Sequence, residues 1–379
     1  MTLREYIERE IRERGPLPFS RYMALCLSGA PAGDPPGFYS RAREQFGKAG
    51  DFYTSSDVHA VFGRLLARQF DEMWRALDSP PRIDLVELGP GRGLLAQDVL
   101  DWTARKFPHF ALALRYTLVE GSPELARRLQ ERFADRIARG KVEVLTGFDD
   151  FRRHYDHAIV FANEFFDALP VEIVSDRGQV YVGAAKGRFE EIFRPLAPEV
   201  DEFLDRYGVR PEAGERVEAC TEAVSWMKRL AAVMRRGFAV FIDYGYTREE
   251  QLAGRHRDTL MTYRRHQAGT NPYEAPGEQD ITAHVNFTAL SESSAALGFD
   301  PLALVTQAQF LMGIGEENQF ADAFEECQLP QERAKVALQL KHIATPVGMG
   351  EVFDVLVLGR GVTKETARGL SGLKFAKGS

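Results

Sequence analysis

Apolar runs of strand length alternate with amphipathic stretches through the middle of the chain. The runs are rich in β-branched residues, and in the stretches between them apolar positions recur at helical spacing. The pattern predicts strands at residues 83–88, 115–120, 142–145 and 158–162, helices at 94–106 and 124–138, and a short helical stretch near 149–155. Alternating strands and helices favour right-handed βαβ units and a parallel sheet.

The pattern changes on both sides of this region. Helices are predicted before it, at residues 2–14, 20–28 and 58–77. After it come a β meander at 171–194, helices at 217–234 and 286–297, and strands at 238–243, 302–306 and 352–358. We therefore expect an N-terminal helical extension at 1–80, a core at 81–360 with an inserted β and helical element at about 171–235, and a flexible basic tail at 361–379.

The first core strand ends in a glycine-rich turn. Residues 83–93 read IDLVELGPGRG, so Glu87 precedes glycines at 89, 91 and 93. At the carboxyl end of a strand, such a turn lets a nucleotide-like ligand approach the backbone closely. A dinucleotide fingerprint would place its last glycine at position 94, where this chain has Leu94. The spacing and the acid favour S-adenosylmethionine (SAM), whose ammonium and sulfonium suit a carboxylate; an ordinary strand-to-helix turn is the alternative.

The second core strand also ends in an acid, Glu120, and Ser122 then provides a helix N-cap. An acid at the tip of this strand can accept hydrogen bonds from both hydroxyls of a ribose. A solvated surface glutamate is the alternative. Seven core strands with the ligand motif on the first describe a Rossmann-like sheet of the class I SAM-dependent methyltransferase type, in which the last strand inserts antiparallel.

The segment after the fourth strand, NEFFDALP at residues 163–170, carries the candidate chemistry. In doubly wound sheets, ligand groups gather beyond the carboxyl ends of strands. Asn163 can accept a hydrogen bond from an amine or a guanidinium, and Glu164 or Asp167 could neutralise a cationic substrate or take its proton. A helix N-terminus with an acidic first turn is the alternative.

Two further polar residues are candidates on the same rim. Asp243 ends the fifth strand, and His284, whose unperturbed pKa is near neutrality, precedes the helix at 286–297. A capped strand end and a structural histidine are the alternatives. The spacing of His154 and His157 does not suit a shared helical face, so we expect no metal site.

Composition narrows the class of protein. The chain has 379 residues, 44% of them hydrophobic, which suffices for a substantial core. A net charge of -7 gives no support for a general nucleic-acid surface, and three distant cysteines without a C-x-x-C motif indicate reduced thiols. No apolar run reaches the length of a membrane span, and the charged N-terminus lacks a signal core. We expect a cytoplasmic protein without membrane insertion.

Several segments together resemble a known family, the MidA-like SAM-dependent methyltransferases, which include the mitochondrial arginine methyltransferase needed for respiratory complex I assembly. The resemblance covers residues 15 to 358. The similar segments, in family order, are GDFYTS at 50–55, VELGPGRG at 86–93, NEFFDALP at 163–170, DYG at 243–245 and PGEQDITAHV at 276–285. The glycine motif is shared by many methyltransferases, whereas NEFFDALP and DITAHV are more specific to this family.

The resemblance implies SAM as cofactor and N-methylation of arginine on a protein, with a complex I subunit as the substrate. The residues expected to bind SAM are Thr54, Glu87, Gly89, Pro90, Gly91, Gly93, Glu120 and Asn163. The candidate catalytic residues are Asn163, Glu164, Asp167, Asp243 and His284. Asn286 stands where relatives would have Asp, which leaves a helix-cap role open for it.

Other functions remain open on the sequence alone. A methyltransferase for RNA or a small molecule is one, and the basic stretches at 255–257 and 264–266 are the only feature that favours RNA. A SAM-binding assembly chaperone without turnover is another. The sequence does not indicate the oligomeric state.

Overall fold

A seven-stranded sheet forms the centre of the molecule. The computed structural model describes residues 1–31, 34–41, 60–265, 267–345 and 348–376. The central strands are β2 (Ile83–Leu88), β3 (Leu114–Glu120), β4 (Val142–Thr146), β5 (Tyr155–Asn163), β10 (Met234–Asp243), β16 (Asp300–Thr306) and β17 (Asp354–Arg360). Their order is β16-β17-β10-β5-β2-β3-β4, and β17 runs antiparallel to both of its neighbours. This confirms the predicted class I α/β fold, including its antiparallel last strand.

Helices cover both faces of this sheet. One face packs against α4 (Ala60–Ala76), α5 (Leu94–Lys106), α7 (Pro123–Arg132), α13 (Gln307–Glu316) and α15 (Pro330–Ala344). The other packs against α10 (Thr221–Val233) and α12 (Phe287–Ala296). The central strands are buried on both faces, which is why they read as nearly continuous apolar runs in the sequence.

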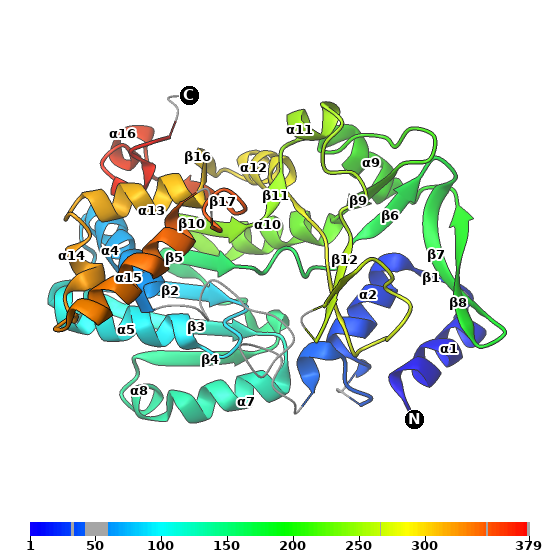
Figure 1. Cartoon of the computed structure of the whole chain (residues 1–379), viewed down its shortest axis with the longest axis horizontal. Coiled ribbons are helices and arrows are strands. Elements are labelled where there is room, and N and C mark those ends of the chain that lie inside the picture. The colour runs from blue at the N-terminus through cyan, green and yellow to red at the C-terminus, as the bar shows by residue number, and fades with distance from the viewer. Residues whose placement is uncertain (32–33, 42–59, 266, 346–347, 377–379) are drawn as a thin grey trace.

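The inserted element forms a second sheet with the N-terminus. Its strands are β6 (Glu172–Ser175), β7 (Gly178–Ala185), β8 (Arg188–Arg194) and β9 (Arg216–Ala219), and α9 (Pro198–Arg206) lies between β8 and β9. The N-terminal strand β1 (Leu17–Pro18) pairs with β7, and α1 (Leu3–Arg14) and α2 (Phe19–Ser28) share an apolar core with this sheet. Figure 1 shows α1, α2 and the β7–β8 hairpin together at one side of the central sheet.

This packing divides the expected N-terminal extension into two parts. Residues 3–28 pack with the inserted sheet, whereas α4 belongs to the core of the central sheet. We propose that the working units are therefore the central sheet with α4 and the inserted sheet with α1 and α2.

Short strands join the two sheets near the carboxyl ends of the central strands. One group is β13 (Gln267–Gly269), β12 (Met261–Arg264) and β14 (Asp280–Thr282), and the other is β11 (Gly245–Tyr246) and β15 (Val285–Asn286), with α11 (Arg248–Leu252) after β11. Asn286 is the N-cap of α12, since its Oδ1 accepts a hydrogen bond from the Ala289 N–H at 2.9 Å. The structure thus gives Asn286 the helix-cap role that the sequence left open.

Three sequence expectations need correction. The predicted helix at 217–234 begins only at Thr221, because residues 216–219 pair with β6 as strand β9. The helical stretch expected near 149–155 is only the 3₁₀ turn η4 (Phe148–Asp150). The tail expected to be flexible is ordered through residue 376: it contains α16 (Lys364–Ala367), and Ser371 bonds Glu72 on α4 at 2.9 Å. Its few apolar residues, such as the buried Leu370, dock on the core despite the basic composition.

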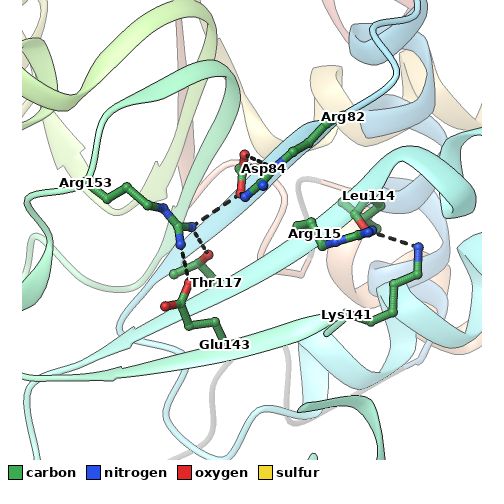
Figure 2. Close-up of polar contacts among 8 residues, drawn as sticks. All are labelled: Arg82, Asp84, Leu114, Arg115, Thr117, Lys141, Glu143 and Arg153. Carbon is green, nitrogen blue, oxygen red and sulfur yellow. Dashed lines mark hydrogen bonds and ion pairs between the residues drawn. The ribbon is translucent and has the colours of Figure 1, made fainter. Parts of the chain in front are cut away.

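A polar network fixes the amino-terminal ends of three central strands (Figure 2). Arg153 donates hydrogen bonds to Asp84 on β2 and Thr117 on β3, both at 3.3 Å, and to Glu143 on β4 at 2.6 Å. Arg82 makes a two-point contact with the same Asp84, at 3.1 and 3.2 Å. Asp84 is buried and therefore needs such partners. The network lies at the opposite ends of the strands from the glycine turn, which indicates a structural role.

Candidate active site

A cavity of about 930 Å³ opens at the carboxyl ends of the parallel strands. Its wall has two parts with different composition. The first, which we call the glycine half, comes from the first βα units and comprises Glu87, Gly89, Pro90, Gly91, Glu120, Ser122, Phe148, Asn163 and Phe165. The second, the acidic half, comprises Asp167, Tyr244, Glu250, Arg255, His256, Tyr263, Asp280, His284 and Asp354.

The glycine turn needs glycine for two different reasons. Gly89, Gly91 and Gly93 all have positive φ, at 64°, 53° and 71°. A Cβ on Gly89 would lie 2.8 Å from the Phe165 ring, inside the cavity wall. A Cβ on Gly93 would instead lie 2.6 Å from Leu129 of α7. Gly89 and Gly91 thus line the cavity, whereas Gly93 lets α5 and α7 pack closely behind it.

Two buried glutamates shape the floor of the glycine half. Glu120 accepts hydrogen bonds from the backbone N–H groups of Ser122 at 2.8 Å and Gly91 at 3.3 Å, so it also holds the glycine turn in place. Glu87 accepts a hydrogen bond from the Tyr116 hydroxyl at 2.8 Å. Burial raises the pKa of each carboxyl to about 7. A cationic or hydroxyl-bearing ligand would stabilise their charged forms.

Asn163 lies at the end of β5, between the two halves. Its Nδ2 donates to Glu164 Oε1 at 3.0 Å, which orients the amide. Its Oδ1 is buried and has no hydrogen-bond partner within the described part of the chain. Glu164 has a φ of 51°, a conformation uncommon for residues other than glycine. Its backbone N–H donates a hydrogen bond to the carbonyl of Ile242 on β10. This strained turn presents both side chains to the cavity.

Asp167 is a buried carboxylate of the acidic half. Its Oδ2 accepts a hydrogen bond from the Tyr244 hydroxyl, and its Oδ1 has no partner among the residues that the structure describes. Burial raises the pKa of Asp167 to about 6. A buried carboxylate oxygen without a partner is costly unless a ligand group meets it, so Asp167 is suited to bind a cationic or N–H-bearing substrate.

Asp243 has a different environment from the one expected of a catalytic acid. Its Oδ2 accepts the backbone N–H groups of Phe165, Phe166 and Asp167 at 3.0–3.3 Å, and its Oδ1 that of Tyr244. It lies behind the cavity wall and is almost fully buried. Burial and the neighbouring Asp167 raise its pKa, while these N–H bonds act in the opposite direction. Its geometry is that of a residue that holds the 163–170 turn.

His284 lines the acidic half beside a second histidine. Its Nδ1 lies 3.1 Å from Nδ1 of His256, so one ring donates to the other. Burial, and then the neighbouring His256, lower the pKa of His284 to about 4. Both the pairing and the low pKa favour the neutral imidazole near pH 7. His284 is therefore a weak base, which favours a role in shaping the cavity wall over a role as proton acceptor.

The structure adds acidic residues that sequence reasoning missed. Asp280 accepts a hydrogen bond from the Tyr39 hydroxyl at 2.9 Å, and Asp354, at the start of β17, has a pKa raised to about 7 by burial and by Glu250. An antiparallel last strand begins at the edge where the parallel strands end, so the position of Asp354 could have been inferred from the fold. Glu250 and Tyr39 carried no such signal. Thr54, predicted to bind the cofactor, lies outside the described residues.

The glycine half fits SAM. SAM needs hydrogen-bond acceptors for its ammonium and its ribose hydroxyls. The wall offers the Oδ1 of Asn163, which has no partner among the described residues, and the carboxylates of Glu87 and Glu120. It also needs an apolar surface for its adenine, which the rings of Phe148 and Phe165, 5.5 Å apart, can supply. The backbone at Gly89 and Gly91 leaves room for close approach.

Known proteins share this arrangement. A family model described as "Putative S-adenosyl-L-methionine-dependent methyltransferase" matches residues 65–305, more than half of the chain. The chain belongs to this family. A crystal structure from Burkholderia thailandensis with bound S-adenosyl-homocysteine (SAH) is 29% identical, with a TM-score of 0.81 over 100% of this chain and 95% of that one. The protein is thus a SAM-dependent methyltransferase, as the resemblance implied.

Curated relatives extend the comparison. The Drosophila melanogaster protein arginine methyltransferase NDUFAF7 homolog is 28% identical over 95% of this chain and 85% of its own length. The human NDUFAF7 is 26% identical over 92% and 81%. Both relatives are mitochondrial proteins, which contradicts the cytoplasmic location expected above. That expectation rested on the charged first residues without an apolar signal core, on the absence of a membrane span and on the reduced cysteines, and none of these features excludes a mitochondrial protein.

Within the described residues, no group of three or more His, Cys, Asp or Glu side chains is placed to hold a metal ion. The helices described in Figure 1 include none that is both long and apolar enough to cross a bilayer.

Proposed function

We propose that this methyltransferase transfers the methyl group of SAM to an arginine side chain of a protein. The observation that carries the proposal is the buried Asp167 carboxylate, which lines the cavity: Tyr244 binds one of its oxygens, and the other has no hydrogen-bond partner in the described part of the chain. The names of the curated relatives, which are protein arginine methyltransferases, support it.

The charge of the acidic half supports a cationic acceptor. Asp167, Glu250, Asp280 and Asp354 line it, and Arg255 is the cation that accompanies them there. Carboxylates at this density repel one another, and a guanidinium would relieve the repulsion. The planar guanidinium also matches a carboxylate in two-point geometry, and its faces can stack on rings such as Tyr244 and Tyr263.

The residues have complementary tasks in this proposal. SAM, when bound, supplies an electrophilic methyl group on a positively charged sulfur. Asn163 and Asp167 hold the guanidinium so that one nitrogen faces that methyl carbon. As the N–C bond forms and the C–S bond breaks, the guanidinium nitrogen must lose a proton, and Asp167 can accept it because its pKa is raised to about 6. Glu164 adds negative charge beside Asn163, and Asp243 supports the turn.

The sequence resemblance further suggests a subunit of respiratory complex I as the protein substrate. A wide, acidic cavity suits an arginine that projects from a loop or a tail of such a subunit.

Methyl labelling tests the proposal. Purified protein is incubated with methyl-labelled SAM and a lysate, the lysate is separated into protein, RNA and small-molecule fractions, and labelled protein is hydrolysed to amino acids. We expect label in the protein fraction as methylarginine. Label confined to RNA or to small molecules would overturn the arginine proposal, and binding of SAM without any label would favour an assembly chaperone.

A further inference from the structure

One buried glutamate outside the cavity is connected to its acidic half. Glu218 lies on β9 of the inserted sheet and is only 3% exposed. Its two oxygens accept hydrogen bonds from the backbone N–H of Thr259 at 3.0 Å and from the Thr259 hydroxyl at 2.9 Å. The Thr259 hydroxyl oxygen in turn accepts the backbone N–H of His284 at 3.1 Å. The three residues thus form a continuous chain from the inserted sheet to the cavity wall.

The neighbouring residues follow the same path. The Asp258 N–H donates to the Arg216 carbonyl at 2.9 Å, and Arg257 forms an ion pair with Glu215. Consecutive residues 257, 258 and 259 are therefore bound to residues 215, 216 and 218 at β9. The two residues just before this anchored stretch, Arg255 and His256, line the acidic half.

The segment at residues 255–259 has an unusual backbone conformation. His256 and Asp258 both have a φ of 54°, a conformation that side chains other than glycine seldom adopt. The His256 ring stacks on Tyr246 at 5.4 Å and meets His284 through its Nδ1. Surrounding contacts must maintain such a conformation, and the bonds to β9 supply them.

We propose that Glu218 is a positioning residue for the methyl acceptor: through Thr259 it sets the places of Arg255, His256 and His284 in the acidic half. The inserted sheet is then the support of the acceptor site, as the central sheet is of the cofactor site. The inference rests on the proposed function where methyl transfer is measured. The histidine resonances and the SAH affinity test it independently of that function.

The test uses the full chain and four substitutions. Glu218→Gln preserves volume but replaces one acceptor oxygen with an N–H₂ group, so only one of the two Thr259 donors still has an acceptor. Thr259→Val preserves shape and removes the hydroxyl, while Thr259→Ser restores it. Glu172→Gln is the matched control, because Glu172 is also buried, in the adjacent strand β6, but accepts a hydrogen bond from Ser20 on α2.

Three properties are measured for each variant: the affinity for SAH by calorimetry, the imidazole resonances of His256 and His284 by NMR, and methyl transfer to the lysate proteins that the wild-type protein labels. For Glu218→Gln and Thr259→Val we expect SAH affinity within twofold of wild type, shifted resonances of both histidines, and transfer reduced at least tenfold. Thr259→Ser and Glu172→Gln should keep wild-type resonances and transfer.

Unchanged histidine resonances in both Glu218→Gln and Thr259→Val would overturn the inference, as would equal effects from Glu172→Gln. If Glu218→Gln does not fold, Thr259→Val, which keeps Glu218, decides the question by the same resonances. If the wild-type protein labels no protein at all, the proposed function fails, whereas the histidine resonances still test the positioning role.

Discussion

The glycine half and the acidic half of the cavity are built in opposite ways. The glycine half comes from successive βα units of one sheet, and Glu120 connects its parts through the backbone of Gly91 and Ser122. The acidic half is assembled from distant segments, since Tyr39, near the N-terminus, donates a hydrogen bond to Asp280 on β14. The first is a local property of the chain, and the second is a property of the whole fold.

The two halves also differ in how their charges are satisfied. Glu120 has backbone N–H partners for both oxygens, whereas Asp167 retains a buried oxygen without a partner among the described residues, in a wall with several other carboxylates. A common cofactor can be bound by a rigid, internally bonded site. The methyl acceptor must instead be recognised by carboxylate charge that no protein group neutralises. This difference predicts that some mutations will weaken cofactor binding and others will slow methyl transfer.

The largest separation should come from Asp167→Asn. Asparagine keeps the shape and can still accept a hydrogen bond from Tyr244, but it cannot take a proton or balance a cation. We expect methyl transfer to fall by about 10²–10⁴-fold, with SAH affinity within about twofold of wild type. Tyr244→Phe should cause a smaller loss, because it only releases one oxygen of Asp167. Transfer at the wild-type rate by Asp167→Asn would remove this residue from the mechanism.

Gly89→Ala should disturb the glycine half, and Gly140→Ala provides a matched control for it. Gly89 and Gly140 have the same φ of 64°, but only Gly89 has a neighbour, Phe165, where a Cβ would be. Gly140→Ala therefore measures the backbone cost alone, about 1 kcal/mol in the free energy of unfolding. Gly89→Ala should cost more stability and weaken SAH binding by about tenfold or more. Equal SAH affinities for the two variants would mean that the turn does not contact the cofactor.

Glu120→Gln should have a moderate effect on binding. The amide retains one acceptor but loses the charge that strengthens hydrogen bonds to hydroxyl groups, so we expect about tenfold weaker SAH binding, or about 1.4 kcal/mol. Glu124→Gln is the control, because Glu124 lies on the surface of α7 and pairs with Arg127 and Arg128. Calorimetry measures both. A wild-type affinity for Glu120→Gln would contradict the assignment of Glu120 to the ribose.

The smallest effect should be a pH dependence of transfer. Because Asp167 accepts a proton only when ionised and its pKa is raised to about 6, the ratio kcat/KM should rise through that pH and then level off. At pH 6 the ratio should be about half of its plateau, and below pH 6 it should fall about tenfold per unit. A profile that is flat between pH 5 and 8 would show that Asp167 does not titrate in the free enzyme.

The sequence predicts the glycine half better than the acidic half, because only the glycine half depends on local patterns in the chain. The positions of Glu87, Gly89 and Glu120 could be predicted, because each depends on a local pattern at the end of a strand. The strand order and the antiparallel β17 could be expected only by analogy with the class I fold, since the sequence does not show strand direction. The roles of Gly93 and Asp243 could not, because the packing of α7 and the N–H groups of another turn determine them.

Long-range contacts also explain the missed residues. Asp280 belongs to the PGEQDITAHV segment, but the sequence assigns it no role, since its partner Tyr39 is far away in the sequence. The sequence predicts a helix over residues 217–219 of β9 because they continue the apolar spacing of α10, and only pairing with β6 makes them a strand.

A crystal structure of this protein with SAH tests the central claim most directly, namely that the two halves of the cavity meet at the methyl group. We predict a ribose within hydrogen-bond distance of Glu120, an ammonium within reach of Asn163 or Glu87, and a sulfur atom that faces Asp167 across open space. A sulfur that points away from Asp167, or SAH bound with protein atoms separating it from the acidic half, would contradict the account.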